Sequence, residues 1–399
     1  MKFVRDALDK VKPHFEKGGK WEKFYYIYEA NETLLFVPNS TTKSKGVQVR
    51  DAVDMKRMMM TVIIAMIPCL LFGIWNAGHQ YFLATGQTPE LVDELLIGAM
   101  LVLPIVAVSY TVGLGIEFTF ATIRRHDVNE GFLVTGMLIP LVMPATVPLW
   151  QVAIATAFAV IIGKEVFGGT GMNILNVALT ARAFLYFAYP SQISGDVWSY
   201  LGDEKAVDAF TGATPLALGA ESLATGKNLV TTLGGFGQGW ADGIYSFGNM
   251  FMGIMPGSIG ETSTLMCLIG AVILIATGVG SWKVILSVFV GAFAMGTFVS
   301  MIGGNPYMEL PAHYHLVIGG LAFGAVFMAS DPVTAAQTES GKWIYGFLIG
   351  VLTIIIRVFN PAYPEGIMLA ILLMNVFAPL IDYFVVSANK KRRLKRATI

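Results

Sequence analysis

Apolar segments long enough to cross a lipid bilayer occupy most of the chain between residues 58 and 387. A membrane helix needs about 20 apolar residues, because the hydrocarbon core of a bilayer is about 30 Å thick. In that core each backbone N–H and C=O must find its partner within the protein, which favours helices. The segments predict an all-α polytopic membrane protein of about ten transmembrane helices, at 58–77, 94–119, 131–147, 149–163, 173–190, 260–278, 283–302, 315–330, 343–358 and 364–387.

Charged side chains are scarce and unevenly distributed along the chain. They make up 14% of the 399 residues, whereas a soluble domain has about 25%. Of the 27 lysines and arginines, twelve lie in residues 1–57 and six in the tail at 390–396. Basic residues flank membrane helices on the cytoplasmic side. We therefore predict a cytoplasmic N-terminal extension over 1–57, a transmembrane domain over 58–387 and a basic cytoplasmic tail over 388–399.

The loop at 191–247 has the opposite charge character. It carries six acidic side chains against two lysines, Lys205 and Lys227, so the same rule places it on the outer side of the membrane. Within this loop lies the stretch Thr211-Gly212-Ala213-Thr214, in which two hydroxyls stand among small residues. Neither threonine has a neighbouring base that would activate it, so the residues alone do not explain the stretch.

Two parts of the chain repeat each other weakly. The segment 131–150 can be laid on 315–334, since in both an apolar helix ends in a short proline-containing break before another helix. The charge pattern sends the two copies through the membrane in opposite directions. We therefore predict an inverted repeat of five plus five helices, a type of fold that places functional groups at broken helices near the repeat interface.

A glycine-rich turn leads into the fifth apolar segment. Its sequence is Gly168-Gly169-Thr170-Gly171-Met172-Asn173, and Asn176 follows it. Glycine permits positive φ angles and close approach of a ligand, and the free amides of a helix N-terminus suit ligand oxygens. Close packing of small residues between membrane helices explains the same glycines, so both interpretations stay open.

Several carboxylates lie in or beside the apolar segments. A charge at the bilayer centre costs at least about 2.5–3.5 kcal/mol, so such groups are candidates for function. We select Glu165 at the inner end of a helix, Asp331 at a helix break and Asp382 deep in an apolar run as candidates for ion coupling. At a break, unwound carbonyls can join a carboxylate around Na⁺. For Asp382 a structural hydrogen bond is the alternative. The residue spacing indicates no metal site, and the two cysteines are expected to be buried small side chains.

Taken together, five stretches resemble one family of membrane proteins. The sequence resembles the B subunit of the sodium-translocating NADH:quinone oxidoreductase, a family to which the D subunit of the Rnf complex is related. The resemblance covers essentially the whole chain, and the long basic extension is typical of the sodium-pump family. The stretches are KEVFGGTGMNILNVALTARAFLYFAYPSQISGD (164–196), TGATPLA (211–217), PGSIGETSTLMCLIGA (256–271), SDPVTA (330–335) and EGIMLAILLMNVFAPLIDY (365–383).

The resemblance implies a role for the outer threonines. In this family a threonine of an S/T-G-A-T motif carries FMN through its phosphate, and the matching position is Thr214, with Thr211, Gly212 and Ala213 completing the motif. A separate flavin transferase makes the bond. This chain then needs only to present a hydroxyl on the outer side, which accounts for the missing base.

The resemblance also implies a non-covalent riboflavin and reduction of ubiquinone near the cytoplasmic face. For riboflavin we select the glycine-rich turn and its amides, with Gly169, Gly171, Asn173 and Asn176. For quinone we select three positions beside the N-terminal extension, Glu130, Gly131 and Gly136. Close packing of small residues is again the alternative explanation for the two glycines.

The implied protein is one subunit of a complex in a bacterial inner membrane, with both termini in the cytoplasm. Electrons from NADH pass through partner subunits to FMN, riboflavin and quinone, coupled to Na⁺ translocation. The chain has no nicotinamide site of its own, and no nucleic acid is implied. Two alternatives are a flavin-carrying subunit of an Rnf-type complex and a non-redox channel for a small solute or cation. The second follows from the ten-helix repeat, which resembles urea- and ammonium-transporter architecture, although such a channel has no need of the TGAT stretch.

Overall fold

The structure is a computed structural model, and every regular element in its described residues is helical. Near the N-terminus, α1 (Lys2–Val11) and α2 (Tyr25–Leu35) form a small unit joined by a loop with two short 3-10 turns. Tyr28 on α2 is buried, and its hydroxyl donates to the Leu8 carbonyl at 3.1 Å, which ties the two helices together. The described residues are 2–36, 53–125, 128, 131–195, 197–200, 212–227, 229–235, 243–360 and 362–397.

Long apolar helices confirm the prediction of an all-α polytopic membrane protein. In the part of the chain that the structure describes, six are long and apolar enough to cross a membrane. They are α3 (Met55–Thr85), α4 (Leu91–Arg124), α6 (Leu149–Gly163) with the 3-10 turn after it, α12 (Trp282–Ile302), α15 (Glu339–Phe359) and α16 (Ile367–Ala397). Three shorter apolar helices are α5 (Gly131–Leu141), α7 (Val177–Ala188) and α11 (Thr264–Ala276).

The apolar segment expected at 315–330 is broken into pieces. It consists of α13 (Ala312–Val317), α14 (Leu321–Phe323) and a π-helix (Gly324–Met328). The first break falls where Gly319 has a φ of +66°, a conformation that suits glycine and ends a helix. The expectation of one unbroken helix here is therefore wrong, whereas the expectation of broken helices is right for this segment.

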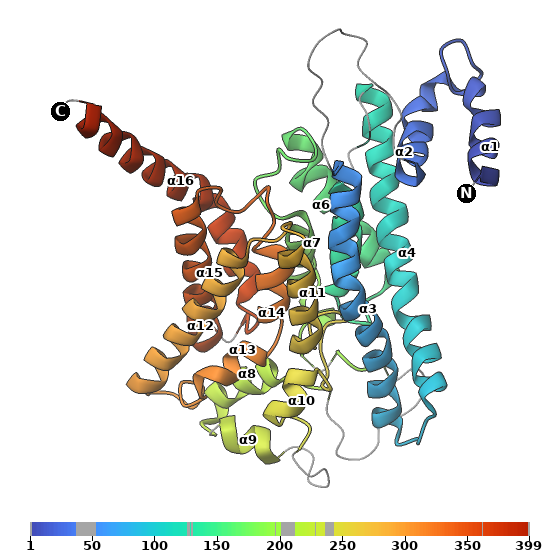
Figure 1. Ribbon diagram of the computed structural model, residues 1–399. Coiled ribbons are helices and arrows are strands. Elements are labelled where there is room, and N and C mark those ends of the chain that lie inside the picture. Colours follow the sequence, from blue (N-terminus) through green and yellow to red (C-terminus); the bar gives the residue numbers. More distant parts are fainter. Residues whose placement is uncertain are drawn as a thin grey trace.

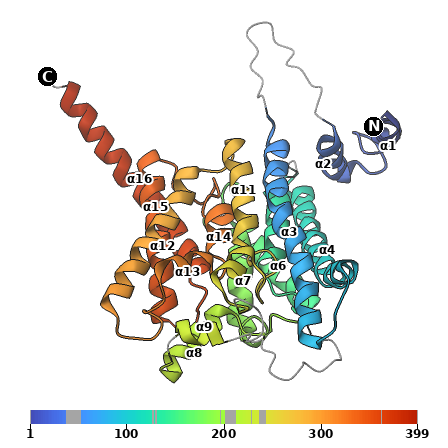
Figure 2. The ribbon, with the colours of Figure 1, turned by 60° about the horizontal axis from the view of Figure 1, so that its bottom comes forward.

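Both chain ends lie at the same end of the molecule (Figures 1 and 2). The opposite end carries the short helices α8 (Pro215–Thr225), α9 (Leu229–Gly235) and α10 (Phe247–Met252). The basic residues at 390–396 are helical, because α16 runs on without a break to Ala397. Neither Gly nor Pro occurs between residues 380 and 397 to stop it.

Glycines bring the long helices into backbone contact. A side chain on Gly98 of α4 would lie 1.7 Å from the carbonyl oxygen of Ile74 on α3. Likewise, a side chain on Gly350 of α15 would lie 2.2 Å from the carbonyl oxygen of Val288 on α12. Such contacts replace the hydrophobic effect as the source of helix association in lipid.

The chain around the break after α5 is held by a segment that is distant in sequence. The amide of Ile259 donates to the carbonyl of Met143 at 3.0 Å, and that of Gly260 to Leu141 at 2.7 Å. Nearby, α3 and α11 pack together, and the buried Sγ atoms of Cys69 and Cys267 lie 3.9 Å apart, as expected for buried small side chains. Residues from the first and second parts of the chain thus share one interior.

Candidate functional site

Thr214 is the N-cap residue of α8. Its hydroxyl oxygen accepts a hydrogen bond from the Ala217 amide at 3.1 Å, and Pro215 occupies the first turn. Threonine followed by proline is a strong helix-start signal, because both satisfy the geometry of the first turn. Gly212 and Ala213 before it are buried, and Thr211 lies outside the described residues. Thr214 itself is half-buried, so its hydroxyl stands at a helix N-terminus within reach of solvent.

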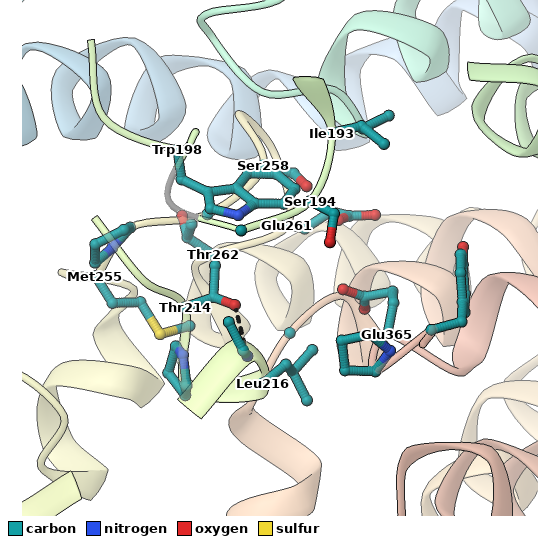
Figure 3. Close-up of a pocket in the computed structure, with 18 of the residues that line it drawn as sticks. Ile193, Ser194, Trp198, Thr214, Leu216, Met255, Ser258, Glu261, Thr262 and Glu365 are labelled. Carbon is teal, nitrogen blue, oxygen red and sulfur yellow. Dashed lines mark hydrogen bonds between the residues drawn. The ribbon is translucent and has the colours of Figure 1, made fainter. Parts of the chain in front are cut away.

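An open hollow lies beside Thr214, and its empty space is about 680 Å³ when the open solvent at its mouth is included. Figure 3 shows Trp198, Met255, Thr262 and Glu365 around the threonine. These residues come from three stretches, the loop after α7, the loop before α11 and the loop before α16. The hollow therefore joins the segment between α7 and α8 to the interior of the helix bundle, and its lining combines an aromatic ring with hydroxyl and carboxylate groups.

Arg182 of α7 forms part of the wall of this hollow and is 4% exposed. Its Nη1 donates to Ser258 Oγ at 3.1 Å, to Glu261 Oε2 at 3.2 Å and to the carbonyl of Val142. Its Nη2 lies 3.9 Å from Glu365 Oε2. The arginine thus links the break after α5 to both carboxylates.

A second buried arginine, Arg357 of α15, lies behind this wall and is 0% exposed. It donates to the carbonyl oxygens of His315 at 2.7 Å, Ile318 at 2.9 Å and Glu365 at 3.1 Å. The carbonyls of His315 and Ile318 lie where α13 ends, so the guanidinium replaces the missing helical partners there. The Glu365 carbonyl also accepts from the Ile367 amide at 2.8 Å. Glu365 in turn accepts from the Gly320 amide at 2.7 Å.

Sequence reasoning overlooked Arg182, Arg357 and Glu365 as candidate site residues. Carboxylates in apolar segments were selected, but an arginine inside an apolar helix is an equally strong signal by the same argument. Arg182 interrupts VALTARAFLYFA and Arg357 interrupts the apolar end of α15.

A second hollow, of about 860 Å³ with open solvent included, is lined in part by Met58 and Met59 near the start of α3. The start of α3 lies toward the end of the molecule that carries the termini (Figure 1). The hollow brings together Asn173, Asn176 and Asp331, as well as Thr170 and Lys164. Asn176 caps α7 by accepting from the Leu179 amide at 3.2 Å, and its Nδ2 lies 3.5 Å from Asp331 Oδ2. The hydroxyl of Thr170 is buried without a hydrogen-bond partner among the described residues. The lining is thus largely apolar with a few polar groups, as is usual for small-molecule sites.

The glycines selected from the sequence fall into two groups. Gly169 and Gly171 have φ angles of +99° and +89°, so the turn conformation itself requires glycine. A side chain on Gly131 would lie 2.5 Å from Thr170 Cγ2, and one on Gly136 would lie 2.8 Å from the Tyr110 ring. The alternative of small-residue packing thus has direct support at Gly131 and Gly136. Glu130 lies outside the described residues.

The three candidate ion-coupling carboxylates lie in different surroundings. Glu165 is buried and pairs with Arg124 at 2.9 Å, next to a buried pair of Lys164 and Glu117. Asp331 lines the second hollow and accepts from Thr334 Oγ1 at 3.0 Å.

Asp382 forms hydrogen bonds of the kind that the structural alternative expects. It accepts from the amides of Gln337 at 2.7 Å and Thr338 at 2.9 Å, at the start of α15. The structure does not bring the three carboxylates together, and no group of three metal-ligating side chains occurs within the described ranges.

Comparison with known proteins gives a consistent result. Residues 42–391 match the model of the NQR2, RnfD, RnfE family. The B subunit of a Na(+)-translocating NADH-quinone reductase from Stutzerimonas stutzeri is 48% identical over 98% of this chain and 99% of its own length. Proteins of the same name from Chromohalobacter salexigens and Pseudomonas aeruginosa are 49% and 48% identical, again over 98% of this chain and 96% and 99% of their own lengths.

Proposed function

The chain belongs to the NQR2, RnfD, RnfE family, and on this premise we propose that it is the B subunit of a respiratory sodium pump. In such a complex it would pass electrons between flavins to ubiquinone, coupled to Na⁺ translocation, and act only with the other subunits. The relatives named as the B subunit match 98% of the chain, including the basic extension that precedes the family model's first residue. This full-length match favours the sodium pump over an Rnf-type complex.

Covalent FMN on Thr214 is the centre of this proposal. One observation carries it: the Thr214 hydroxyl lies at the N-terminus of α8, on the wall of an open hollow that an aromatic ring and polar side chains line. When bound, FMN supplies one- and two-electron redox chemistry. The phosphate of a Thr214 ester would lie near the amides of the first turn of α8, which favour an anion. The Trp198 ring offers an aromatic surface in the same hollow.

The flavin assignment is tested on the intact protein produced together with a flavin transferase. We expect a band that fluoresces under ultraviolet light on an unstained denaturing gel, because a phosphodiester survives denaturation. A band without fluorescence would contradict the flavin proposal and favour a non-redox channel.

We assign riboflavin to the second hollow, with Gly169, Gly171, Asn173 and Asn176 at or near its polar side. The two glycines hold the turn open through their positive φ angles. Asn173 and Asn176 line the hollow, and the unpaired Thr170 hydroxyl beside them fits a polar ring edge.

Thr170→Val is expected to lower the non-covalent flavin content several-fold, because valine keeps the shape and removes the hydroxyl. The measurement is flavin released on denaturation, relative to covalent flavin in the same sample. Thr180→Val is the matched control, since the Thr180 hydroxyl already donates to the Asn176 carbonyl at 2.9 Å. Equal loss in both variants would speak against Thr170 as a ligand contact.

We place ubiquinone at the end of the bundle that carries the termini, beside the N-terminal extension. There Trp21, Phe24 and Tyr25 line an open hollow with the end of α4, and Tyr26 donates to the Arg125 carbonyl at 3.0 Å. Aromatic side chains of this kind suit a flat quinone ring. Of the predicted quinone positions, Glu130 and Gly131 are nearest in sequence to this end of α4, and Gly136 packs further inside α5.

For ion coupling we keep Asp331, Asp382 and Glu165 as candidates and expect the largest effect at Asp331. Asp331→Ala should weaken the sodium stimulation of quinone reduction more than it lowers flavin content, because a dehydrated cation loses its carboxylate. Asp382→Ala is the comparison, since Asp382 caps the start of α15. Unchanged sodium dependence in both variants would remove them from the ion path.

We further propose that the helices form an inverted repeat of five plus five, with the termini in the cytoplasm of a bacterium and α8 outside its inner membrane. In support, α4 packs on α6 and α6 on α7, as α12 packs on α15 and α15 on α16. These are the second, fourth and fifth helices of each half.

A further inference from the structure

One carboxylate oxygen in the hollow beside Thr214 has no hydrogen-bond partner among the residues that the structure describes. Glu261 is 3% exposed, and its Oε2 accepts from Arg182 at 3.2 Å. Its Oε1 is buried with no partner among the described residues. The hydroxyl of the adjacent Thr262, which is also 3% exposed, is unpaired in the same way. Both residues line the hollow.

Unpaired buried polar atoms of this kind are costly. Leaving a buried acceptor unsatisfied costs about 1–3 kcal/mol, and more for a charged group. The Ser258 hydroxyl, which accepts from Arg182, also forms a hydrogen bond with the Glu261 carboxylate, but Oε1 itself still has no partner among the described residues. An oxygen and a hydroxyl that stay unpaired in one hollow point to a ligand that supplies the missing partners.

The charges around Glu261 indicate what kind of ligand group its Oε1 would bind. The described charged side chains here are two arginines, Arg182 and Arg357, and two glutamates, Glu261 and Glu365. Their formal charges cancel, so a cation bound at Oε1 would leave an uncompensated positive charge in a buried site. A neutral N–H donor satisfies the oxygen without changing the balance.

We propose that Glu261 is a positioning residue that accepts a hydrogen bond from the imide N–H of the flavin ring tethered to Thr214, with the Thr262 hydroxyl on an adjacent ring carbonyl. This inference rests on the covalent flavin of the proposed function. The imide edge of the ring is the flavin's neutral N–H donor, flanked by two carbonyl acceptors. That pattern complements a carboxylate beside a hydroxyl.

The proposal has a consequence for the flavin's reduction potential. A reduced flavin carries more negative charge on its ring, and a carboxylate held against that ring opposes this charge. Glu261 would therefore keep the potential of the tethered flavin low. Removing its charge should make the flavin easier to reduce.

The test is a redox titration of the intact complex carrying covalent flavin, followed by visible absorbance. The component that belongs to the tethered flavin is the one missing from the Thr214→Ala complex. Glu261→Gln should favour the reduced form at least tenfold at fixed potential, which is about 59 mV upward for a one-electron couple. Infrared difference spectra of the ring carbonyls should shift at the same time.

Two further variants separate the hydrogen bond from general electrostatics. Glu365→Gln removes a charge beside the same Arg182, but its oxygens already have partners, so a smaller shift is expected. Glu261→Asp keeps the charge and withdraws the oxygen, so the infrared bands should shift while the potential changes less. If Glu261→Gln does not fold, Glu261→Asp still tests the proposed hydrogen bond.

The outcomes distinguish this inference from the proposed function. If the wild-type chain carries no covalent flavin, the proposed function fails. If the flavin is attached but Glu261→Gln leaves its potential and infrared bands unchanged, the inference alone is overturned. An equal shift in Glu261→Gln and Glu365→Gln, or unchanged bands in Glu261→Asp, overturns it as well.

Discussion

Replacement of Thr214 by alanine is expected to abolish the covalent flavin completely. The substitution removes the oxygen through which the phosphate would be attached, so no alternative bond can form at this position. It also removes the N-cap of α8, which accepts from Ala217, at a cost of about 1 kcal/mol. The measurement is ultraviolet-excited fluorescence of the denatured band, normalised to total protein.

Thr214→Ser is the matched variant, since serine keeps both the hydroxyl and the cap. It should retain the fluorescent band, which shows that the loss in Thr214→Ala comes from the missing bond and not from a frayed helix. If Thr214→Ala keeps the fluorescence, the attachment site is wrong. Thr211→Ala then tests the other hydroxyl of the motif.

Replacement of Arg357 by methionine is expected to cause the largest loss of stability among these variants. Methionine fills a similar volume, but the carbonyls of His315 and Ile318 lose their donor in a buried site, and that of Glu365 keeps only the Ile367 amide. Leaving buried acceptors of this kind without a donor costs about 1–3 kcal/mol each. We expect a lower melting temperature in detergent, read by tryptophan fluorescence, together with poor recovery of monodisperse protein.

Lys283→Ala is the control for this prediction. Lys283 also forms an ion pair, but its partner Glu339 has a side chain that is 66% exposed, and such surface pairs contribute little. Its melting temperature should stay close to that of the wild type. If Arg357→Met were as stable as Lys283→Ala, the carbonyls at the break would have other partners, and the role assigned to Arg357 would be wrong.

The sequence predicted the membrane class and most of the helices correctly, for a local reason. A long apolar run has to be helical in lipid whatever its neighbours are, because its backbone groups find partners only within the run. Thus the runs at 149–163 and 283–302 correspond to α6 and α12 within one residue at each end. Glycine likewise marked the turn at Gly169, whereas α8 was not predicted and begins within the expected loop.

Side-chain roles that depend on distant partners were not predictable in this way. Asp382 looked like a buried charge in its own run, but in the structure it caps α15, which begins more than 40 residues earlier. Gly136 suggested room for a ring, but the Tyr110 ring lies against it. In both cases the contacting residue comes from a distant part of the chain, so the local sequence pattern does not reveal the contact.

The sequence by itself therefore determined that this chain is a bundle of membrane helices with a threonine motif in a loop of opposite charge character. Only the tertiary structure decided that Thr214 shares a hollow with Arg182, Glu261 and Glu365. The reason is physical. The backbone groups of a helix in lipid find their hydrogen-bond partners within one segment. A buried charged side chain finds its partners only in residues that folding brings from elsewhere in the chain.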